Sequence, residues 1–247
     1  MTEQYPEQPV ALVAGATGAI GAALVELLVE QGWTVVATQR TITESPSSDG
    51  PVHWVSFDGT TEDGITHLKD GLAGIPGTLA AIIFTIGVPS SKKPVAETTA
   101  AEYEEVFCGN VTSAVRLWHA VHPRARDGRA GVVLLSSDTT VTLRPRNGAY
   151  STAKAGLEAL AATLAAEESQ YGVRVNVVAP SLVESPLAEH ILAAKGVTAP
   201  GQYYLELPWG RALSVEEVAR VAFDVATGVQ WQYVSGQTIR LAARTGQ

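Results

Sequence analysis

Residues 10–30 read V-A-L-V-A-G-A-T-G-A-I-G-A-A-L-V-E-L-L-V-E, and this stretch decides the fold. It opens with a short apolar run, turns through three glycines and continues as an apolar pattern typical of a helix. In such a strand-turn-helix unit, Gly15 permits the tight turn, Gly18 lets the backbone approach a pyrophosphate, and Gly21 lets the helix pack near the strand. A glycine triplet alone is usually a structural turn, but this context predicts a nucleotide site. The residues expected to contact the nucleotide here are Gly15, Thr17, Gly18, Ile20 and Gly21.

Further short runs rich in apolar and β-branched residues follow, separated by helical patterns. They lie at 34–38, 52–57, 80–85, 131–137, 173–179 and 237–241. Nearly continuous apolar strands that alternate with helices predict an α/β fold, a doubly wound Rossmann-type parallel sheet with helices on both faces. A chain of 247 residues with 46% hydrophobic content can bury one such core. We expect a single domain at 10–247, preceded by a polar, disordered lead-in at 1–9 that lacks the pattern of a signal peptide.

The end of the second run bears on the choice of nucleotide. About 20 residues beyond the glycine turn, an NAD-binding chain usually carries an acid for the ribose hydroxyls, but here the run ends in Gln39 and Arg40. An acid would repel a 2′-phosphate, whereas a guanidinium offers it charge and paired donors. Arg40 therefore favours NADP(H) over NAD(H). The alternative is a solvated arginine in a polar loop.

The segment Y-S-T-A-K places Tyr150 and Lys154 four residues apart in an alanine-rich helical pattern, so one helical turn brings both to the same face. A phenol has an ordinary pKa of about 10 and is a poor proton donor or acceptor near neutral pH. A neighbouring ammonium would lower that pKa towards the range where general acid/base catalysis is efficient. An exposed Tyr and Lys on a helix surface is the competing interpretation of the spacing alone.

With the glycine turn, this segment makes the sequence resemble the short-chain dehydrogenase/reductase family from Val10 to about Leu241. The family places a serine thirteen positions before the tyrosine, where this chain has Ser137, and an asparagine in the preceding long helix, where it has Asn110. The resemblance implies seven strands and the catalytic residues Asn110, Ser137, Tyr150 and Lys154. It implies cofactor contacts at Asp58, Gly87, Tyr150, Lys154, Pro180, Val183 and Ser185 in addition to Arg40 and the glycine turn.

The chemistry implied by the resemblance is hydride transfer between a nicotinamide and a carbonyl or secondary alcohol. Tyr150 would exchange the proton with the substrate oxygen, and Ser137 would hydrogen-bond the same oxygen. Lys154 would lower the pKa of Tyr150 and bind the nicotinamide ribose, while Asn110 would order a water that links the lysine to solvent. Asp58 would accept a hydrogen bond from the adenine amino group, although it fits equally well as a loop or N-cap aspartate.

Some positions depart from the family pattern. The glycine turn has Ala14 and Ala19 where threonine and glycine are common, which leaves the fit of the pyrophosphate open. In place of N-N-A-G after the fourth strand this chain has F-T-I-G, which keeps only Gly87. We expect apolar packing by Phe84 and Ile86 to substitute for the two asparagines that brace the sheet.

The bulk composition favours a small-molecule substrate in the cytoplasm. A net charge of −8 argues against nucleic acid or an anionic membrane as the main partner. The single cysteine, Cys108, fits a reducing compartment and is expected to be a packing residue. His119 and His122 lack carboxylate or thiolate companions, so we expect no metal site.

The segment 185–209 should determine specificity, since the family uses this region as a lid. Its residues Leu187, His190, Ile191, Leu192, Tyr203, Tyr204, Leu205, Leu207 and Trp209 suggest an apolar or aromatic pocket. They could equally pack the lid or a subunit interface. The family also implies a homo-oligomer, a dimer or tetramer, built on long helices that begin near Ala101 and Ala149. Two other functions stay open: a non-catalytic NAD(P)-sensing protein of the same fold, and a nucleotide-sugar epimerase or dehydratase.

Overall fold

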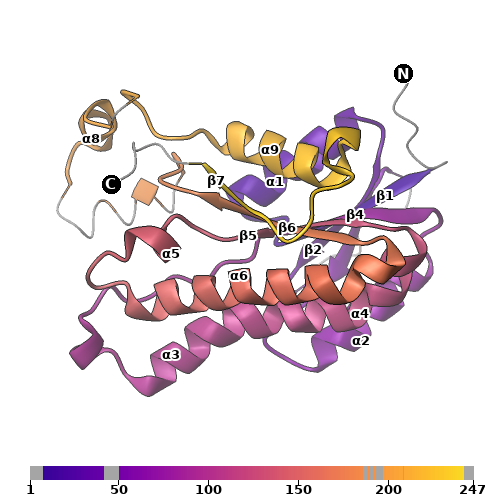
Figure 1. Cartoon of the computed structure of the whole chain (residues 1–247), viewed down its shortest axis with the longest axis horizontal. Coiled ribbons are helices and arrows are strands. Elements are labelled where there is room, and N and C mark those ends of the chain that lie inside the picture. Colours follow the sequence, from indigo (N-terminus) through magenta and orange to yellow (C-terminus); the bar gives the residue numbers. More distant parts are fainter. Residues whose placement is uncertain are drawn as a thin grey trace.

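The computed structural model describes residues 8–41, 50–185, 188–189, 192, 197–207 and 209–241. The strands within these ranges form one parallel sheet of seven strands in the order β3-β2-β1-β4-β5-β6-β7 (Figure 1). They are β1 (Pro9–Ala14), β2 (Thr34–Gln39), β3 (Val52–Ser56), β4 (Thr78–Phe84), β5 (Gly131–Leu135), β6 (Arg174–Pro180) and β7 (Thr238–Leu241). The predicted doubly wound fold is confirmed. Because β1 begins at Pro9, the last residue of the predicted lead-in belongs to the sheet.

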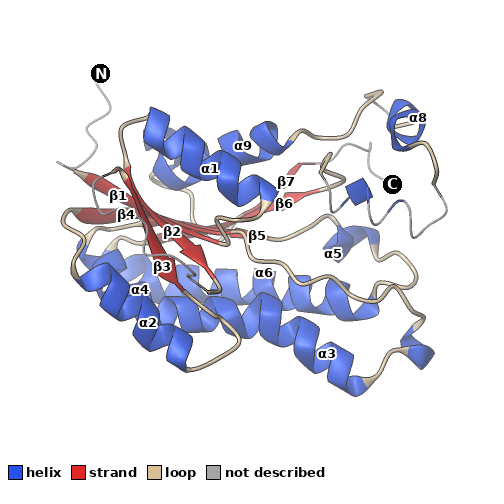
Figure 2. Ribbon diagram, turned by 180° about the vertical axis from the view of Figure 1, so that it is seen from behind, coloured by secondary structure: helices blue, strands red, loops and turns tan. Residues whose placement is uncertain are grey.

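Helices cover both faces of the sheet, as Figures 1 and 2 show. One face carries α1 (Ala19–Glu30) and α9 (Val215–Thr227), and the other carries α2 (Asp63–Ala73), α4 (Ser113–Asp127) and α6 (Gly148–Glu168). The central strand β1 is fully buried from Val10 to Ala14, and its side chains alternate between two apolar cores. Leu12 packs in the core under α2, α4 and α6, whereas Val13 packs under α1 and α9. The strand order reverses between β1 and β4, so the carboxyl ends of the strands open a crevice there.

The long helix expected near Ala101 is interrupted. It consists of α3 (Ala100–Phe107), a π-helical turn at Cys108–Thr112, and α4. A π turn inserts one extra residue into a helix and frequently occurs at functional sites. This one contains Asn110, which is fully buried. The second long helix, α6, begins at Gly148 and is continuous to Glu168.

The remaining short elements are α5 (Thr139–Thr142), α8 (Pro200–Leu205) and single 3₁₀ turns at Val95–Glu97, Ser169–Tyr171 and Val229–Trp231. The Gly- and Pro-containing cluster at 196–201 predicts a loop from the sequence, but this is partly wrong, because Pro200 starts α8. Leu187, His190 and Ile191 lie outside the described residues. The Ser-, Pro- and Gly-containing cluster at 45–51 also predicts a loop, and most of it lies outside the described residues. None of the helices in the described ranges combines the length and apolarity needed to cross a bilayer.

Candidate active site

A cavity of about 290 Å³ lies at the carboxyl edge of the sheet, where β4, β5 and β6 end. The predicted site residues that line it are Ile20, Gly87, Ser137, Tyr150, Lys154, Pro180, Val183 and Ser185. These residues come from five different segments of the chain, and the parallel sheet brings them to one edge. The cavity does not include the predicted residues Gly15, Thr17, Gly18, Gly21, Arg40, Asp58 and Asn110.

Tyr150 projects from the first turn of α6 into this cavity and is half-buried. Burial, the largest cause, and the negative charge of Asp138 together raise the pKa of its phenol to about 12, although a hydrogen bond from Ser137 opposes them. The two groups that would share the substrate oxygen are therefore in direct contact. At neutral pH, the phenol carries its proton.

Lys154 lies one turn after Tyr150 and is only 2% exposed. Its Nζ donates a 2.9 Å hydrogen bond to the carbonyl oxygen of Leu135 at the end of β5, and lies 5.7 Å from the centroid of the Tyr150 ring. Burial lowers the pKa of this amine to about 7. The predicted juxtaposition is present, but the predicted lowering of the Tyr150 pKa is wrong for this structure, because burial dominates the phenol and leaves the amine only partly charged near neutral pH.

Asn110 braces the segment that follows β4. Its Nδ2 donates to the carbonyl oxygens of Val88 (2.9 Å) and Val106 (2.8 Å), and its Oδ1 accepts from the Val88 amide at 3.3 Å. A Cβ atom added to Gly87 would lie 3.6 Å from Lys154 Nζ and 3.8 Å from Asn110 Oδ1. The Lys154 amine and the Asn110 carbonyl oxygen therefore both lie close to Gly87, on the side where a side chain would project.

The glycine turn has the geometry that the sequence predicts. Gly15 has φ +86°, and a Cβ there would lie 2.8 Å from Thr85 Oγ1; a Cβ on Gly21 would overlap the carbonyl oxygen of Gly15. In contrast, a Cβ on Gly18 would make only an ordinary contact, 3.5 Å from that oxygen. Gly18 is thus not required by packing within the chain. A backbone left bare towards the outside of the turn, at the N-terminus of α1, fits a pyrophosphate.

The turn is held in place by two threonines. Thr85 donates from its hydroxyl to the carbonyl oxygens of Ala14 (2.8 Å) and Gly15 (3.1 Å), and the Gly15 amide donates to Thr38 Oγ1 at 3.2 Å. Phe84 is fully buried in the core. The expectation that apolar packing alone replaces the family's asparagines is therefore incomplete, because the threonine of F-T-I-G supplies a polar brace.

Arg40 and Asp58 follow the ends of adjacent strands, β2 and β3. Arg40 is exposed, and its charge helps to lower the pKa of the Asp58 carboxyl, although the hydrogen bond from the Thr60 hydroxyl is the larger cause and burial opposes both. Asp58 Oδ1 accepts from the Thr60 hydroxyl (2.6 Å) and amide (2.9 Å). This is the loop interpretation of Asp58. The structure also shows that an acid just after β3 lies in the field of Arg40, which the sequence of β2 does not reveal.

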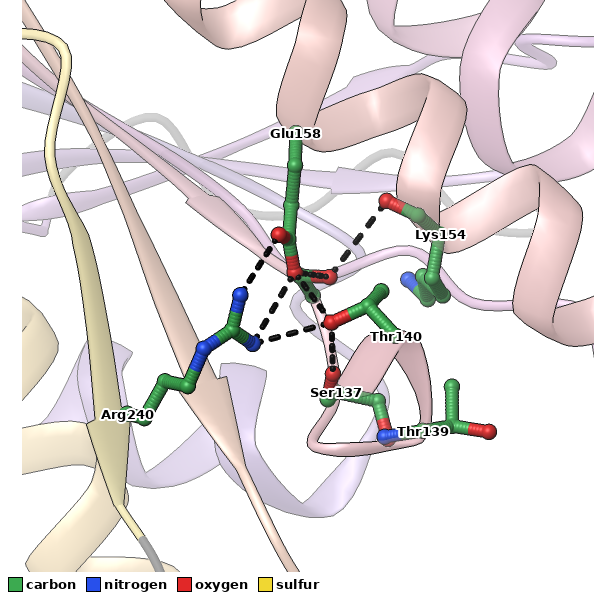
Figure 3. Close-up of polar contacts among 7 residues, drawn as sticks. Ser137, Thr139, Thr140, Lys154, Glu158 and Arg240 are labelled. Carbon is green, nitrogen blue, oxygen red and sulfur yellow. Dashed lines mark hydrogen bonds and ion pairs between the residues drawn. The ribbon is translucent and has the colours of Figure 1, made fainter. Parts of the chain in front are cut away.

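A polar network behind the cavity was missed at the level of sequence (Figure 3). Glu158, on α6, accepts from Ser136 Oγ (2.8 Å), Thr140 Oγ1 (2.8 Å) and Arg240 of β7 (2.9 Å). Thr140 Oγ1 lies 3.2 Å from the carbonyl oxygen of Ser137, and it accepts from Arg240 at 2.9 Å. The network fixes the segment that carries the Ser137 hydroxyl. Its one signal in the sequence is that Glu158 follows Lys154 at the same spacing of four residues.

Some of the apolar residues expected in the lid segment 185–209 line the cavity, and others do not. Leu192, Tyr203 and Leu207 line the cavity, together with Leu182. Tyr204 is buried in the core, whereas Leu205 and Trp209 are exposed.

Comparison with known proteins places this arrangement in a family. The family described as Enoyl-(Acyl carrier protein) reductase matches residues 15–242. Cis-4-hydroxycyclohexanecarboxylate dehydrogenase of Sinomonas cyclohexanicum is 30% identical over 231 residues, which cover 90% of this chain and 91% of that protein. The 3-oxoacyl-[acyl-carrier-protein] reductase FabG of Thermotoga maritima is 27% identical over 241 residues, 94% of this chain and 96% of that protein.

Solved structures show the same fold. The ligand-free aldohexose dehydrogenase of Thermoplasma acidophilum superimposes with a TM-score of 0.85 at 19% identity, over 96% of this chain and 93% of that one. ElxO with NADP bound superimposes with a TM-score of 0.82 at 16% identity, over 95% and 97% of the two chains. The family match, the seven-stranded sheet and the clustered Ser137, Tyr150 and Lys154 agree, and the chain belongs to the short-chain dehydrogenase/reductase family of NAD(P)-dependent oxidoreductases.

Proposed function

We propose that the protein is an NADP(H)-dependent oxidoreductase that interconverts a carbonyl and a secondary alcohol, with Tyr150 as the general acid and base. The observation that carries this proposal is the contact between Ser137 and Tyr150 inside a cavity that Lys154 also lines. A nicotinamide held at the carboxyl edge of the sheet would supply the hydride or accept it.

The protein groups have distinct tasks. Tyr150, protonated at neutral pH because its pKa is raised to about 12, donates a proton to an oxygen that gains negative charge. Ser137 donates a hydrogen bond to the same oxygen and stabilises that charge. The Lys154 amine, with a pKa of about 7, is able to exchange a proton in the working range. Asn110 Oδ1 can accept a second hydrogen bond, which supports a water between it and the lysine.

The preference for NADP(H) rests on Arg40. The guanidinium is exposed at the end of β2, where a 2′-phosphate would approach, and β2 itself ends without an acid. Asp58 in its vicinity reduces the net positive charge there, so we expect a preference and not a complete exclusion of NAD(H).

For the substrate, we propose a compound with an apolar ring. The relative from Sinomonas cyclohexanicum is named for a hydroxyl on a cyclohexane ring, and it aligns with 90% of this chain. The cavity wall formed by Leu182, Leu192, Tyr203 and Leu207 is of the type that receives such a ring.

The test is a fluorescence titration with NADPH and NADH, followed by a panel of cyclic and aromatic ketones with the tighter cofactor. Tyr150→Phe should abolish most turnover, a loss on the order of a hundredfold or more, because general acid catalysis contributes about that much. Tyr233→Phe is the matched control, since Tyr233 is 92% exposed and outside the cavity. Full activity of the Tyr150 variant would refute the mechanism. Tight NADPH binding without turnover of any ketone or alcohol would point to a sensor.

A further inference from the structure

One wall of the cavity carries positive charge that the proposed hydride transfer does not use. Lys92, from the segment after β4, and Arg144, from the segment between α5 and α6, both line the cavity beside Tyr150. The apolar side chains Leu182, Leu192, Tyr203 and Leu207 line the same cavity. The cavity therefore offers both cationic and apolar groups to a ligand.

Lys92 is held in a defined position over the catalytic tyrosine. Its Nζ lies 5.4 Å from the centroid of the Tyr150 ring and donates to the side-chain oxygen of Asn147. Asn147 is itself buried and donates to the hydroxyls of Thr139 and Ser151, so its own orientation is fixed. The ammonium is thus aimed at the cavity by an anchored amide.

The backbone of this wall adopts conformations that L-residues rarely adopt. Lys92 has φ +61°, and Leu143 (φ +40°) and Arg146 (φ +62°) lie on either side of Arg144. Left-handed backbone in residues other than glycine is unfavourable, and such strained residues cluster at functional sites. Left-handed backbone is therefore present in both segments that carry a cation lining the cavity, the one with Lys92 and the one with Arg144.

Within the described part of the chain, the ion pair that Arg144 makes is a long one. Its Nη2 lies 3.9 Å from Asp138 Oδ2, and its side chain is 39% exposed. A guanidinium has five N–H donors in a planar fork, and one distant carboxylate engages a small part of that capacity. The fork can therefore receive a second acceptor from the cavity.

The charges on the described lining residues are unlike those of the whole protein. The chain has a net charge of −8, yet the described residues that line the cavity include three basic side chains, Lys92, Arg144 and the partly charged Lys154. Asp138 is the one carboxylate among these described lining residues. Positive charge in a partly closed cavity attracts an anion, and a carboxylate matches both a guanidinium and an ammonium.

We propose that the substrate carries a carboxylate, which Lys92 and Arg144 bind while the apolar wall receives the hydrocarbon body. This deepens the proposed function and rests on it. It adds an acid group to the apolar or aromatic substrate expected from the sequence of the lid. The acid group would hold the ring so that the carbonyl faces Ser137 and Tyr150.

The experiment compares matched ketones that differ only in charge: 4-acetylbenzoate with 4-acetylbenzamide, and 4-oxocyclohexanecarboxylate with its amide. The quantity measured is the ratio of kcat/KM for the acid to kcat/KM for the amide. In the wild type this ratio should be about ten or more, because a hydrogen bond to a charged group is stronger than one to a neutral group. Lys92→Gln and Arg144→Gln should each lower the ratio about tenfold, mainly through KM for the acid.

Lys93→Gln is the matched control, since Lys93 is the exposed neighbour of Lys92 and does not line the cavity; its ratio should equal that of the wild type. Lys92→Arg should retain most of the ratio, because it keeps the charge. A wild-type ratio near one, or a ratio unchanged in both Gln variants, would overturn the inference while leaving the oxidoreductase intact.

If no ketone of either kind is reduced, the proposed function fails, and binding decides the inference separately. The change in melting temperature that benzoate causes in the presence of NADPH is then compared with the change that benzamide causes. Stabilisation by benzoate that is lost in Lys92→Gln would support an anion site. Equal shifts with both compounds would reject it.

Discussion

Replacing Glu158 by Gln tests whether the network in Figure 3 positions Ser137 for catalysis. Glu158 does not line the cavity, and its side chain is 15% exposed. Its carboxylate accepts from Ser136, Thr140 and Arg240, and Thr140 in turn lies 3.2 Å from the Ser137 carbonyl oxygen. The amide keeps the shape of the side chain but removes its charge. Any effect on turnover must therefore pass through the residues that Glu158 holds.

The contacts set the size of the effect. A hydrogen bond to a charged group contributes about 1.5–3 kcal/mol and a neutral one about 0.5–1.5 kcal/mol, so each of the three bonds weakens by about 1 kcal/mol. The Arg240 side chain is 32% exposed, so water compensates for part of the loss of its bond to Glu158. We expect a loss of about 2 kcal/mol in the free energy of unfolding. For a chain of this size, that corresponds to a melting temperature lower by about 4–8 °C.

The assay combines thermal unfolding with steady-state kinetics. Because a small displacement of a catalytic group lowers the rate steeply, we expect kcat to fall by about tenfold with little change in KM for NADPH. Glu167→Gln, an exposed glutamate on the same helix, is the control and should change neither quantity. Thr140→Val breaks the link to Ser137 but keeps the Glu158–Arg240 ion pair, so kcat should fall with a smaller loss of stability. An unchanged kcat in both Glu158→Gln and Thr140→Val would refute the positioning role.

Three other parts of the structure give measurable expectations. Lys154→Met removes an amine whose pKa burial lowers from 10.5 to about 7, so between these pH values the folded protein binds fewer protons than the unfolded chain. In urea titrations, the stability of the wild type relative to the variant should therefore rise by up to about 5 kcal/mol as the pH rises through that window. A difference that does not change with pH would contradict the buried amine. Gly18→Ala should leave the melting temperature nearly unchanged but weaken NADPH binding, measured by fluorescence, about tenfold or more. Gly21→Ala should instead destabilise the fold itself, because its methyl group overlaps the Gly15 carbonyl oxygen. Arg126→Met leaves the buried Glu168 carboxylate unpaired and should lower the free energy of unfolding by about 3 kcal/mol in urea, and the double variant with Glu168→Met should recover most of that loss.

The sequence predicted best those features that depend on neighbours along the chain. The glycine turn follows from local steric requirements, and the structure confirms them at Gly15 and Gly21. The spacing of four residues placed Tyr150 and Lys154 on one face of a helix, which the structure also shows. Short-range geometry of this kind is fixed by the periodicity of the helix.

Features that depend on tertiary contacts were not predictable in the same way. The partner of the Thr85 hydroxyl lies about seventy residues earlier in the chain, so no local pattern marks it. The pKa of Tyr150 depends on how deeply the fold buries the phenol, and burial reversed the direction that the neighbouring amine alone would give. The π turn around Asn110 adds one residue to a helix, which a pattern of apolar positions is too coarse to detect.

The end of β5 and one face of α6 are matched residue by residue, and this match explains why the site has its geometry. Leu135, Ser136 and Ser137 are consecutive, and they contact Lys154, Glu158 and Tyr150, which follow one another at intervals of four along the helix. A shift of α6 by one turn would break all three contacts at once. The position of α6 is in turn set by its buried face in the core, which includes Ala153 and Leu157. The separation between the phenol and the serine hydroxyl is therefore a consequence of helix-on-sheet packing, and their two backbone segments cannot move apart unless the core moves with them.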